Sequence, residues 1–150
     1  MNLELIDHRR GPADDRWWKP PFDFAVVYAH PQWWNRQLDD DPWLVQVLEG
    51  ETEVARVEFD DPGRINPSYA DVPELGDERL EIQFIEVASA ACGRKIGTQV
   101  LRRLADRHPD RRLFAYSEEA DRFWASVGWE PFYDPGPGPV GRTLFIQPLQ

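Results

Sequence analysis

The chain has 150 residues, of which 41% are hydrophobic and 13% aromatic, and its formal net charge is −10. This length and composition predict one folded domain spanning residues 1–150 and exclude an intrinsically disordered chain. The acidity also gives no support to nucleic-acid binding, which calls for a basic surface. A single cysteine, Cys92, excludes an intramolecular disulfide and indicates a reducing compartment, and we expect its side chain to be buried and inert.

The first residues contain no extended apolar core of the kind that secretory signal peptides carry, and no stretch approaches transmembrane length. We therefore expect a cytoplasmic protein without a membrane partner. The three histidines, His8, His30 and His108, lie far apart in the sequence and lack metal-ligand spacing with Cys92 or an acid, so we expect no metal site.

The N-terminal part begins with residues 3–7, where alternating apolar and acidic residues predict a strand. Five of the seven tryptophans then fall between positions 17 and 43 and are separated by prolines. Residues 14–19 and 32–38 favour short helices, and residues 22–29 fit either a helix or a strand. Tryptophans so arranged pack against a sheet or line a pocket.

The middle of the chain reads as strands joined by turns. Residues 43–48 and 52–59 flank Glu49-Gly50-Glu51, the signature of an antiparallel hairpin. Residues 62–79 are rich in proline, glycine and acids and predict a surface loop. Residues 80–87 then predict a central strand, apolar on both faces.

The C-terminal part alternates helices with strands. Ile96, Val100, Leu101 and Leu104 share one helical face. A short strand follows at residues 112–116, and Ser117 is placed to cap a second helix whose apolar face holds residues 120, 123, 124 and 127. Residues 129–133 and 143–149 predict two further strands around a proline- and glycine-rich loop.

A glycine-bearing turn precedes the first of these helices. Such a turn exposes backbone N–H groups and the positive end of the helix dipole, which together favour an anion. Residues 1–79 carry 18 acidic and 8 basic residues, whereas residues 80–150 carry 9 of each, so the cations are concentrated in the part of the chain that holds this turn. The turn is either a phosphate site or an ordinary strand-to-helix connection.

Two segments resemble motifs of the GNAT superfamily of acetyl-CoA-dependent N-acetyltransferases. Cys92-Gly93-Arg94-Lys95-Ile96-Gly97-Thr98 is similar to the pyrophosphate loop that follows the central strand of that family. The segment from Ser117 to Trp124, followed by Gly128-Trp129, is similar to the family's Asn-x-x-Ala-x-x-Phe-Tyr…Gly-Phe segment. The resemblance implies an α+β, three-layer fold with a mixed, mostly antiparallel central sheet flanked by helices.

The resemblance also implies acetyl-CoA as co-substrate and a set of binding residues. In the family, loop amides and the helix N-terminus bind the pyrophosphate, and pantetheine amides pair with the central strand where it separates from the next one. Carried over to this sequence, the cofactor-binding residues are Ile85, Val87, Cys92, Gly93, Arg94, Lys95, Ile96, Gly97, Thr98, Ser117, Phe123 and Trp124.

The catalytic residues are less directly implied. Glu81 aligns with a position where some family members keep a catalytic glutamate; the alternative is a solvated carboxylate on a strand. Glu86 is the poorer candidate because it adjoins the proposed pantetheine track. The family's proton-donating tyrosine is Trp124 here, so Tyr116 and Tyr133 are the candidates for the acid.

The sequence departs from the family pattern at Cys92, Lys95, Ser117 and Trp124. Two functions therefore stay open: transfer of an acetyl group to an amine, or a domain of the same fold that binds CoA or a protein partner without catalysis. The expected acceptor is a small-molecule or peptide amine. The many aromatic residues could also form a surface through which two copies associate as a homodimer. Residues 14–43 and 135–141 are where the family builds acceptor specificity.

Overall fold

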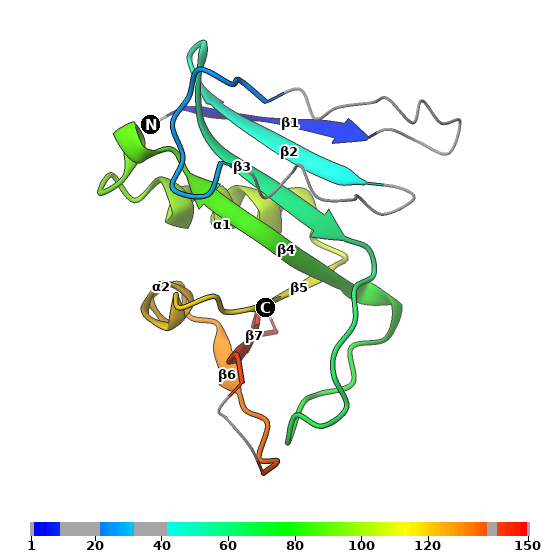
Figure 1. Ribbon diagram of the computed structural model, residues 1–150. Helices are drawn as coiled ribbons and strands as arrows, with labels where there is room; N and C mark the ends of the chain where they lie inside the picture. Colours follow the sequence, from blue (N-terminus) through cyan, green and yellow to red (C-terminus); the bar gives the residue numbers. More distant parts are fainter. Residues whose placement is uncertain (1, 10–21, 32–41, 138–140, 150) are drawn as a thin grey trace. The chain divides into compact units, whose positions relative to one another are not determined.

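The computed structural model describes residues 2–9, 22–31, 42–137 and 141–149 (Figure 1). The expected short helices at 14–19 and 32–38, most of the tryptophan-rich segment and Asp39 to Asp41 lie outside these residues. The described chain forms two compact units, one of residues 1–59 and 84–103 and the other of residues 60–83 and 104–150. Strand β4 (Arg79–Val87) and helix α1 (Ile96–Arg107) each contribute residues to both units.

The strands follow the order β1-β2-β3-β4-β5-β7-β6 in a seven-stranded sheet. The pairs β1–β2, β2–β3, β5–β7 and β6–β7 are antiparallel, and β4–β5 is parallel. The mixed, mostly antiparallel sheet with helices that the sequence predicted is thus confirmed.

The first unit is built on a meander of three strands, β1 (Leu3–Arg9), β2 (Trp43–Glu49) and β3 (Thr52–Asp60). The β2–β3 hairpin forms as predicted, and Gly50 takes the left-handed conformation that its turn requires (φ +63°). Arg103 of α1 donates a hydrogen bond to the carbonyl of Leu3 (3.2 Å), which ties the helix to β1. The apolar residues of α1 at positions 96, 100 and 101 are buried, as the helical period predicted.

Residues 22–31 form neither a helix nor a strand but an irregular segment in front of the strands in Figure 1. Buried polar groups hold this segment. Glu53, only 2% exposed, accepts hydrogen bonds from the hydroxyl of Tyr28 (2.8 Å), the amide of Asp23 (3.0 Å) and the side chain of Gln46 (2.9 Å). The expectation of a regular element was wrong because side-chain acceptors bind backbone amides of the segment instead: Glu53 of β3 accepts from Asp23, and Glu86 of β4 accepts from His30.

The second unit contains the first half of β4, strands β5 (Arg112–Tyr116), β6 (Glu130–Phe132) and β7 (Leu144–Ile146), and helix α2 (Asp121–Ser126). Trp124 of α2 packs against Trp129 and Phe145, with ring centroids 4.8 and 6.5 Å away. A second cluster consists of Phe114, Leu144, Ile146 and Leu75, with Ile65, Tyr69 and Val72 packed against it.

The loop between β3 and β4 therefore supplies part of the core of the second unit. Residues 62–79 were expected at the surface, yet Leu75 is buried and Gly63 is buried as well. A loop without helical or strand period can still bury isolated apolar side chains when its backbone groups find partners.

Candidate functional site

The turn before α1, predicted to bind an anion, contains two residues in the left-handed conformation. Gly93 and Lys95 both have positive φ angles, +83° and +59°, and Ile96 begins the helix. The carbonyl of Lys95 accepts the first helical hydrogen bond, from the amide of Gln99 (3.2 Å). The N–H groups of residues 96–98 consequently have no intrahelical carbonyl to bind. These N–H groups lie at the N-terminus of the 12-residue helix, which is the positive end of its dipole.

Lys95 explains one departure from the family pattern. It stands where the motif has its first glycine, and it adopts the left-handed conformation that favours glycine. A lysine in this conformation costs about 1–2 kcal/mol.

Arg94 does not stand free beside the loop. Its guanidinium pairs with the carboxylate of Glu49 at the end of β2 (2.7 Å), and this contact lowers the pKa of Glu49. The pair is half-exposed, so Arg94 is available to an anion only in competition with Glu49.

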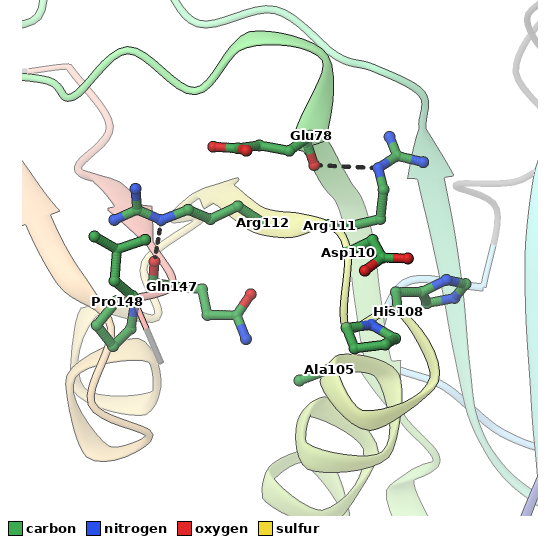
Figure 2. Close-up of a pocket in the computed structure, with 10 residues that line it drawn as sticks. Glu78, Ala105, His108, Asp110, Arg111, Arg112, Gln147 and Pro148 are labelled. Atoms are coloured by element: carbon green, nitrogen blue, oxygen red, sulfur yellow. Dashed lines mark hydrogen bonds between the residues drawn. The ribbon is translucent and has the colours of Figure 1, made fainter.

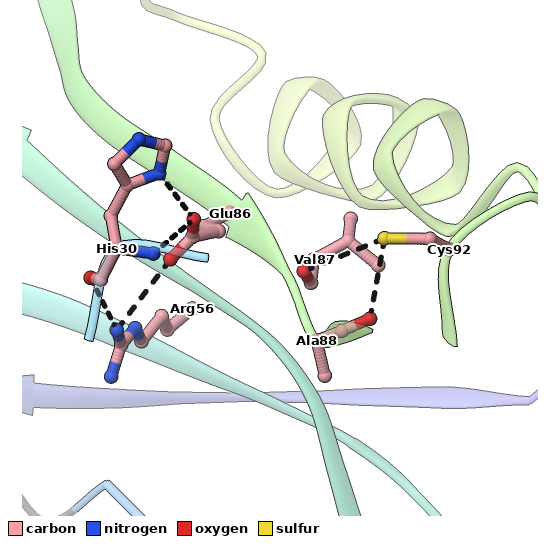
Figure 3. A network of polar contacts seen from close by, with 6 residues as sticks. All are labelled: His30, Arg56, Glu86, Val87, Ala88 and Cys92. Atoms are coloured by element: carbon pink, nitrogen blue, oxygen red, sulfur yellow. Dashed lines mark hydrogen bonds and ion pairs between the residues drawn. The ribbon is translucent and has the colours of Figure 1, made fainter. Parts of the chain in front are cut away.

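Cys92 is exposed, which corrects the expectation of a buried thiol. It lies in the turn after the short 3-10 helix Ser89–Ala91, and its Sγ is 3.4 Å from the carbonyl oxygen of Ala88 (Figure 3). The exposure follows from its place at the start of the glycine loop, outside the packed face of α1.

Ile85 and Val87 lie half-buried near the C-terminal end of β4. Between them, Glu86 accepts a hydrogen bond from the backbone of His30 (3.0 Å) and lies 2.7 Å from its Nδ1. Its other oxygen is 3.6 Å from the guanidinium of Arg56, which donates to the carbonyl of His30 (Figure 3). Glu86 is thereby engaged in holding residues 22–31, in keeping with its lower rank as a base candidate.

In the second unit, Glu81 is buried, with 8% of its surface exposed. The alternative of a solvated strand carboxylate is therefore wrong. Glu81 pairs in register with Phe114 of β5, and the parallel ladder between β4 and β5 ends at this pair. The backbone of Gly63 lies directly against the Glu81 side chain: a Cβ at position 63 would be 2.5 Å from Cβ and 3.0 Å from Oε1 of Glu81.

Tyr116 is held by the same loop. Its hydroxyl accepts a hydrogen bond from the amide of Asn66 (2.8 Å) and donates one to the carbonyl of Arg64 (3.2 Å). Burial is the main cause that raises the pKa of Tyr116, and the charge of Glu81 raises it further, whereas the Asn66 amide and the cation of Arg142 oppose the shift.

The other acid candidate, Tyr133, follows β6 and is 60% exposed. Its backbone carbonyl accepts a hydrogen bond from the amide of Ala70 (3.0 Å). Of the two tyrosines, Tyr133 is the exposed one, and Tyr116 is the one whose pKa is raised by the charge of Glu81.

The second motif segment also differs from its expected geometry. Ser117 does not cap α2, because the helix begins at Asp121. The hydroxyl of Ser117 instead accepts a hydrogen bond from the amide of Ala120 in the preceding turn (3.0 Å). Phe123 is half-buried and meets the ring of Trp124 edge-on (5.1 Å). Trp124 is 4% exposed and belongs to the core. Its indole N–H can donate a hydrogen bond, but the side chain has no ionisable hydroxyl, so it does not replace the family's tyrosine as an acid.

A separate cavity of about 200 Å³ lies in the second unit where α1 ends and β5 begins (Figure 2). Its lining includes His108, Asp110, Arg111 and Arg112. Arg111 donates a hydrogen bond to the carbonyl of Glu78 (3.1 Å), and Arg112 donates one to the carbonyl of Gln147 (2.8 Å). The residues predicted from the sequence do not line this cavity.

Sequence reasoning missed the residues that surround Glu81 and Tyr116. Gly63, Arg64 and Asn66 contact these two side chains through backbone atoms, and backbone contacts leave no signature in residue type. The one available signal was a glycine after a proline, which indicates a turn and no more.

Comparisons with known proteins give the fold. No protein-family model matches the chain, and no curated protein matches it. Among solved structures, an acetyltransferase from Thermus thermophilus has a TM-score of 0.54 at 22% identity, over 72% of this chain and 64% of that one. This chain therefore spans less than two thirds of the Thermus protein.

Two further structures match over nearly the whole chain. A GNAT family acetyltransferase from Elizabethkingia anophelis, solved with acetyl-CoA bound, has a TM-score of 0.51 at 12% identity and covers 95% of both chains. The IAA acetyltransferase from Bacillus cereus has a TM-score of 0.50 at 12% identity, over 95% of this chain and 97% of that one. The chain thus has the fold of the GNAT acetyltransferases, as the motifs predicted.

Membrane spans and metal clusters are both absent from the described residues. None of the helices in this part of the chain is long and apolar enough to cross a membrane. Within the same residues, no group of three or more histidine, cysteine or acidic side chains is arranged to hold a metal ion.

Proposed function

We propose that this protein is an acyl-CoA-dependent N-acetyltransferase that moves an acetyl group from acetyl-CoA to an amine. The observation that carries the proposal is the loop Cys92–Thr98, whose left-handed residues turn the chain into the N-terminus of α1. This loop follows β4 in a chain with the fold of the GNAT acetyltransferases, and one protein of that fold was solved with acetyl-CoA bound.

The residues of the loop fit a pyrophosphate. Amides at the start of α1 are donors that an anion can use, and Gly97 in the first turn leaves them accessible because it has no side chain. A Cβ at Gly93 would meet no other atom within 4 Å, so space is open beside the loop. Lys95 adds an exposed cation. The backbone of Ile85 and Val87 is proposed to pair with the pantetheine arm.

The chemistry needs few side chains. The amine nitrogen attacks the thioester carbonyl, the C–S bond breaks, and the CoA thiolate leaves. Glu81 is proposed as the base that removes the proton from the amine, directly or through a water. A tyrosine is proposed to return a proton to the thiolate, and Tyr133 is the candidate with the exposed ring.

A second candidate function is a domain of this fold that binds CoA without turnover. Two observations favour it: Trp124 is part of the core, and the Tyr116 hydroxyl is bonded to loop backbone on both sides. In that case the phosphate loop would keep its role, and neither tyrosine would transfer a proton.

Calorimetric titration with acetyl-CoA and CoA, together with a thiol-release assay over a panel of small-molecule and peptide amines, separates the two functions. Binding with transfer supports the enzyme, and binding without transfer across the panel supports the second candidate. Absence of binding to either nucleotide would exclude both.

The role of Glu81 has its own test. Glu81→Gln should lower kcat more than it changes KM, and the limb of the pH–rate profile that reports the base should disappear. Glu78→Gln serves as the matched control, because Glu78 is an exposed carboxylate just before the same strand. Equal pH–rate profiles for wild type and Glu81→Gln would rule the base role out.

The remaining proposals concern the setting of this activity. The acceptor is a small-molecule or peptide amine, the protein works in the cytoplasm, and two copies associate as a homodimer in a concentration-dependent way. Sedimentation velocity at several concentrations tests the last point, and a monomer throughout would contradict a dimer.

A further inference from the structure

The segment Asp61–Asn66, here called the strap, is fixed at its first half by two arginines. Asp61 forms an ion pair with Arg111, and the carbonyl of Gly63 accepts a hydrogen bond from Nε of Arg79 (3.2 Å). Arg111 also donates to the carbonyl of Arg79 (2.8 Å), so both anchors belong to one network at the start of β4. The first half of the strap is thus held independently of Tyr116.

The strap covers Glu81. Gly63 is buried with φ +80°, and the space where its Cβ would stand is occupied by Glu81 and by Phe114, whose Cζ would be 3.0 Å away. Only glycine lets the backbone come this close, because any other side chain would collide with Glu81. Access to the Glu81 carboxylate on this side is therefore controlled by the position of the strap.

The second half of the strap is held by Tyr116. A tyrosine hydroxyl has one proton to donate, and in Tyr116 that proton is directed to the carbonyl of Arg64, while the amide of Asn66 donates to the oxygen. Delivery of this proton to a leaving group would first break the bond to Arg64. Packing adds to the fixation, since the ring of Tyr69 meets that of Tyr116 edge-on at 5.5 Å.

We propose that Tyr116 is a positioning residue: it holds the strap over Glu81 and thereby controls how water and the acceptor amine reach that carboxylate. The role of Glu81 as base rests on the proposed function; the hold of Tyr116 on the strap does not. Loosening the strap exposes Glu81, and restoring the two hydrogen bonds covers it again.

The first test needs no activity. Carboxylates are labelled with a water-soluble carbodiimide and an amine nucleophile, and the labelled peptides are quantified by mass spectrometry. In the wild type, Glu81 should react more slowly than the exposed Glu78. Tyr116→Phe removes both hydrogen bonds to the strap, and each net hydrogen bond corresponds to a factor of about five. It should therefore raise the labelling rate of Glu81 about five- to thirtyfold, and amide exchange at Asn66 by a similar factor.

Two further variants make the result specific. Gly63→Ala keeps the tyrosine but forces the strap away from Glu81, so Glu81 labelling should rise as in Tyr116→Phe. Tyr28→Phe removes a buried tyrosine hydroxyl in the first unit and should leave Glu81 labelling unchanged. Circular dichroism and thermal melts confirm that each variant is folded. Unchanged labelling of Glu81 in folded Tyr116→Phe overturns the proposal.

Kinetics then distinguish positioning from proton donation. If Tyr116 acts through the strap, Tyr116→Phe and Gly63→Ala change kcat and KM alike, and the double variant is no worse than either single one. If Tyr116 donates the proton, only Tyr116→Phe loses the limb of the pH–rate profile that reports the acid, and that result also overturns the proposal. Should the wild type transfer no acetyl group, the proposed function fails, and the labelling and exchange rates still decide on the strap.

Discussion

Lys95→Gly tests the claim that the turn before α1 holds a lysine in a strained, left-handed conformation. Lys95 has φ +59°, and its side chain is exposed, so the conformation is imposed by the turn rather than by packing of the lysine. A left-handed non-glycine residue costs about 1–2 kcal/mol, and glycine loses about 0.5–1 kcal/mol more backbone entropy on folding than alanine. The difference predicts a net stabilisation of up to about 1.5 kcal/mol, with a midpoint of about 0.75 kcal/mol.

The measurement is the thermal and urea-induced unfolding of wild type and variant. For a chain of this size, a gain of that order raises Tm by about 2–3 °C. Lys95→Ala is the first control, since it removes the same ammonium group without relieving the backbone and should not raise Tm.

Glu119→Gly is the second control. Glu119 is also exposed and also has a positive φ, +57°, but it lies in the turn before α2. The same physical argument predicts a similar rise in Tm there, with no effect on CoA affinity. If Lys95→Gly lowered Tm while Glu119→Gly raised it, the lysine side chain would be stabilising the turn, and the strain argument would be refuted for this loop.

Three other predictions concern the loop and the ionisable groups. Gly97→Asp should raise the Kd for CoA roughly tenfold or more by placing a carboxylate beside the phosphates, whereas Gly97→Ala should not; calorimetry measures both. Glu49→Gln should release Arg94 and tighten CoA binding by a factor of about 2–5 at low salt, a gain that salt at about 0.5 M should abolish. Burial and the hydrogen bond to Glu53 raise the pKa of Tyr28, so stability should be intact below about pH 10, where an unfolded tyrosine ionises, and should fall as the pH rises further. Tyr28→Phe should flatten this decline in urea unfolding between about pH 9 and 11, and an unchanged slope would contradict the assignment.

The strands and helices were predictable where apolar residues recur with a regular period. In β3 and α1 the alternation or the helical period of apolar residues specifies the element, and both form at the expected positions. The segment 22–31 was not predictable in the same way. Its conformation depends on buried Glu53 and Arg56 of β3, which lie more than twenty residues away in sequence.

The turn before α1 could be predicted for a similar local reason. Gly93 and Gly97 mark a turn into a helix, and that turn forms before Ile96; its binding of a phosphate stays a prediction. Lys95 illustrates the limit, because residue type alone argued against a left-handed conformation that the turn nonetheless imposes.

The surroundings of the proposed catalytic groups depend on tertiary contacts instead. From the sequence, Glu81 could be either a solvated carboxylate on a strand or a catalytic one. The structure excludes the solvated carboxylate, because Glu81 is buried with Gly63 against it. Tyr116 was a candidate for the acid, and nothing in its own segment indicates that its hydroxyl has hydrogen-bond partners. Those partners are backbone groups of Arg64 and Asn66, about fifty residues earlier in the chain.

These contacts bear on why the chain departs from the family motif without losing the fold. Trp124 replaces a tyrosine hydroxyl with a ring that packs between Trp129 and Phe145, so the change adds buried apolar area to the second unit. Position 124 then supplies no tyrosine hydroxyl, and the hydroxyl of Tyr116 is bonded to the backbone of Arg64 and Asn66. If acetyl transfer occurs and Tyr116 keeps its bonds to the strap, Tyr133 is the remaining tyrosine candidate for protonating the thiolate. Tyr133→Phe tests this role: loss of the acid limb of the pH–rate profile identifies Tyr133, and an unchanged profile excludes it.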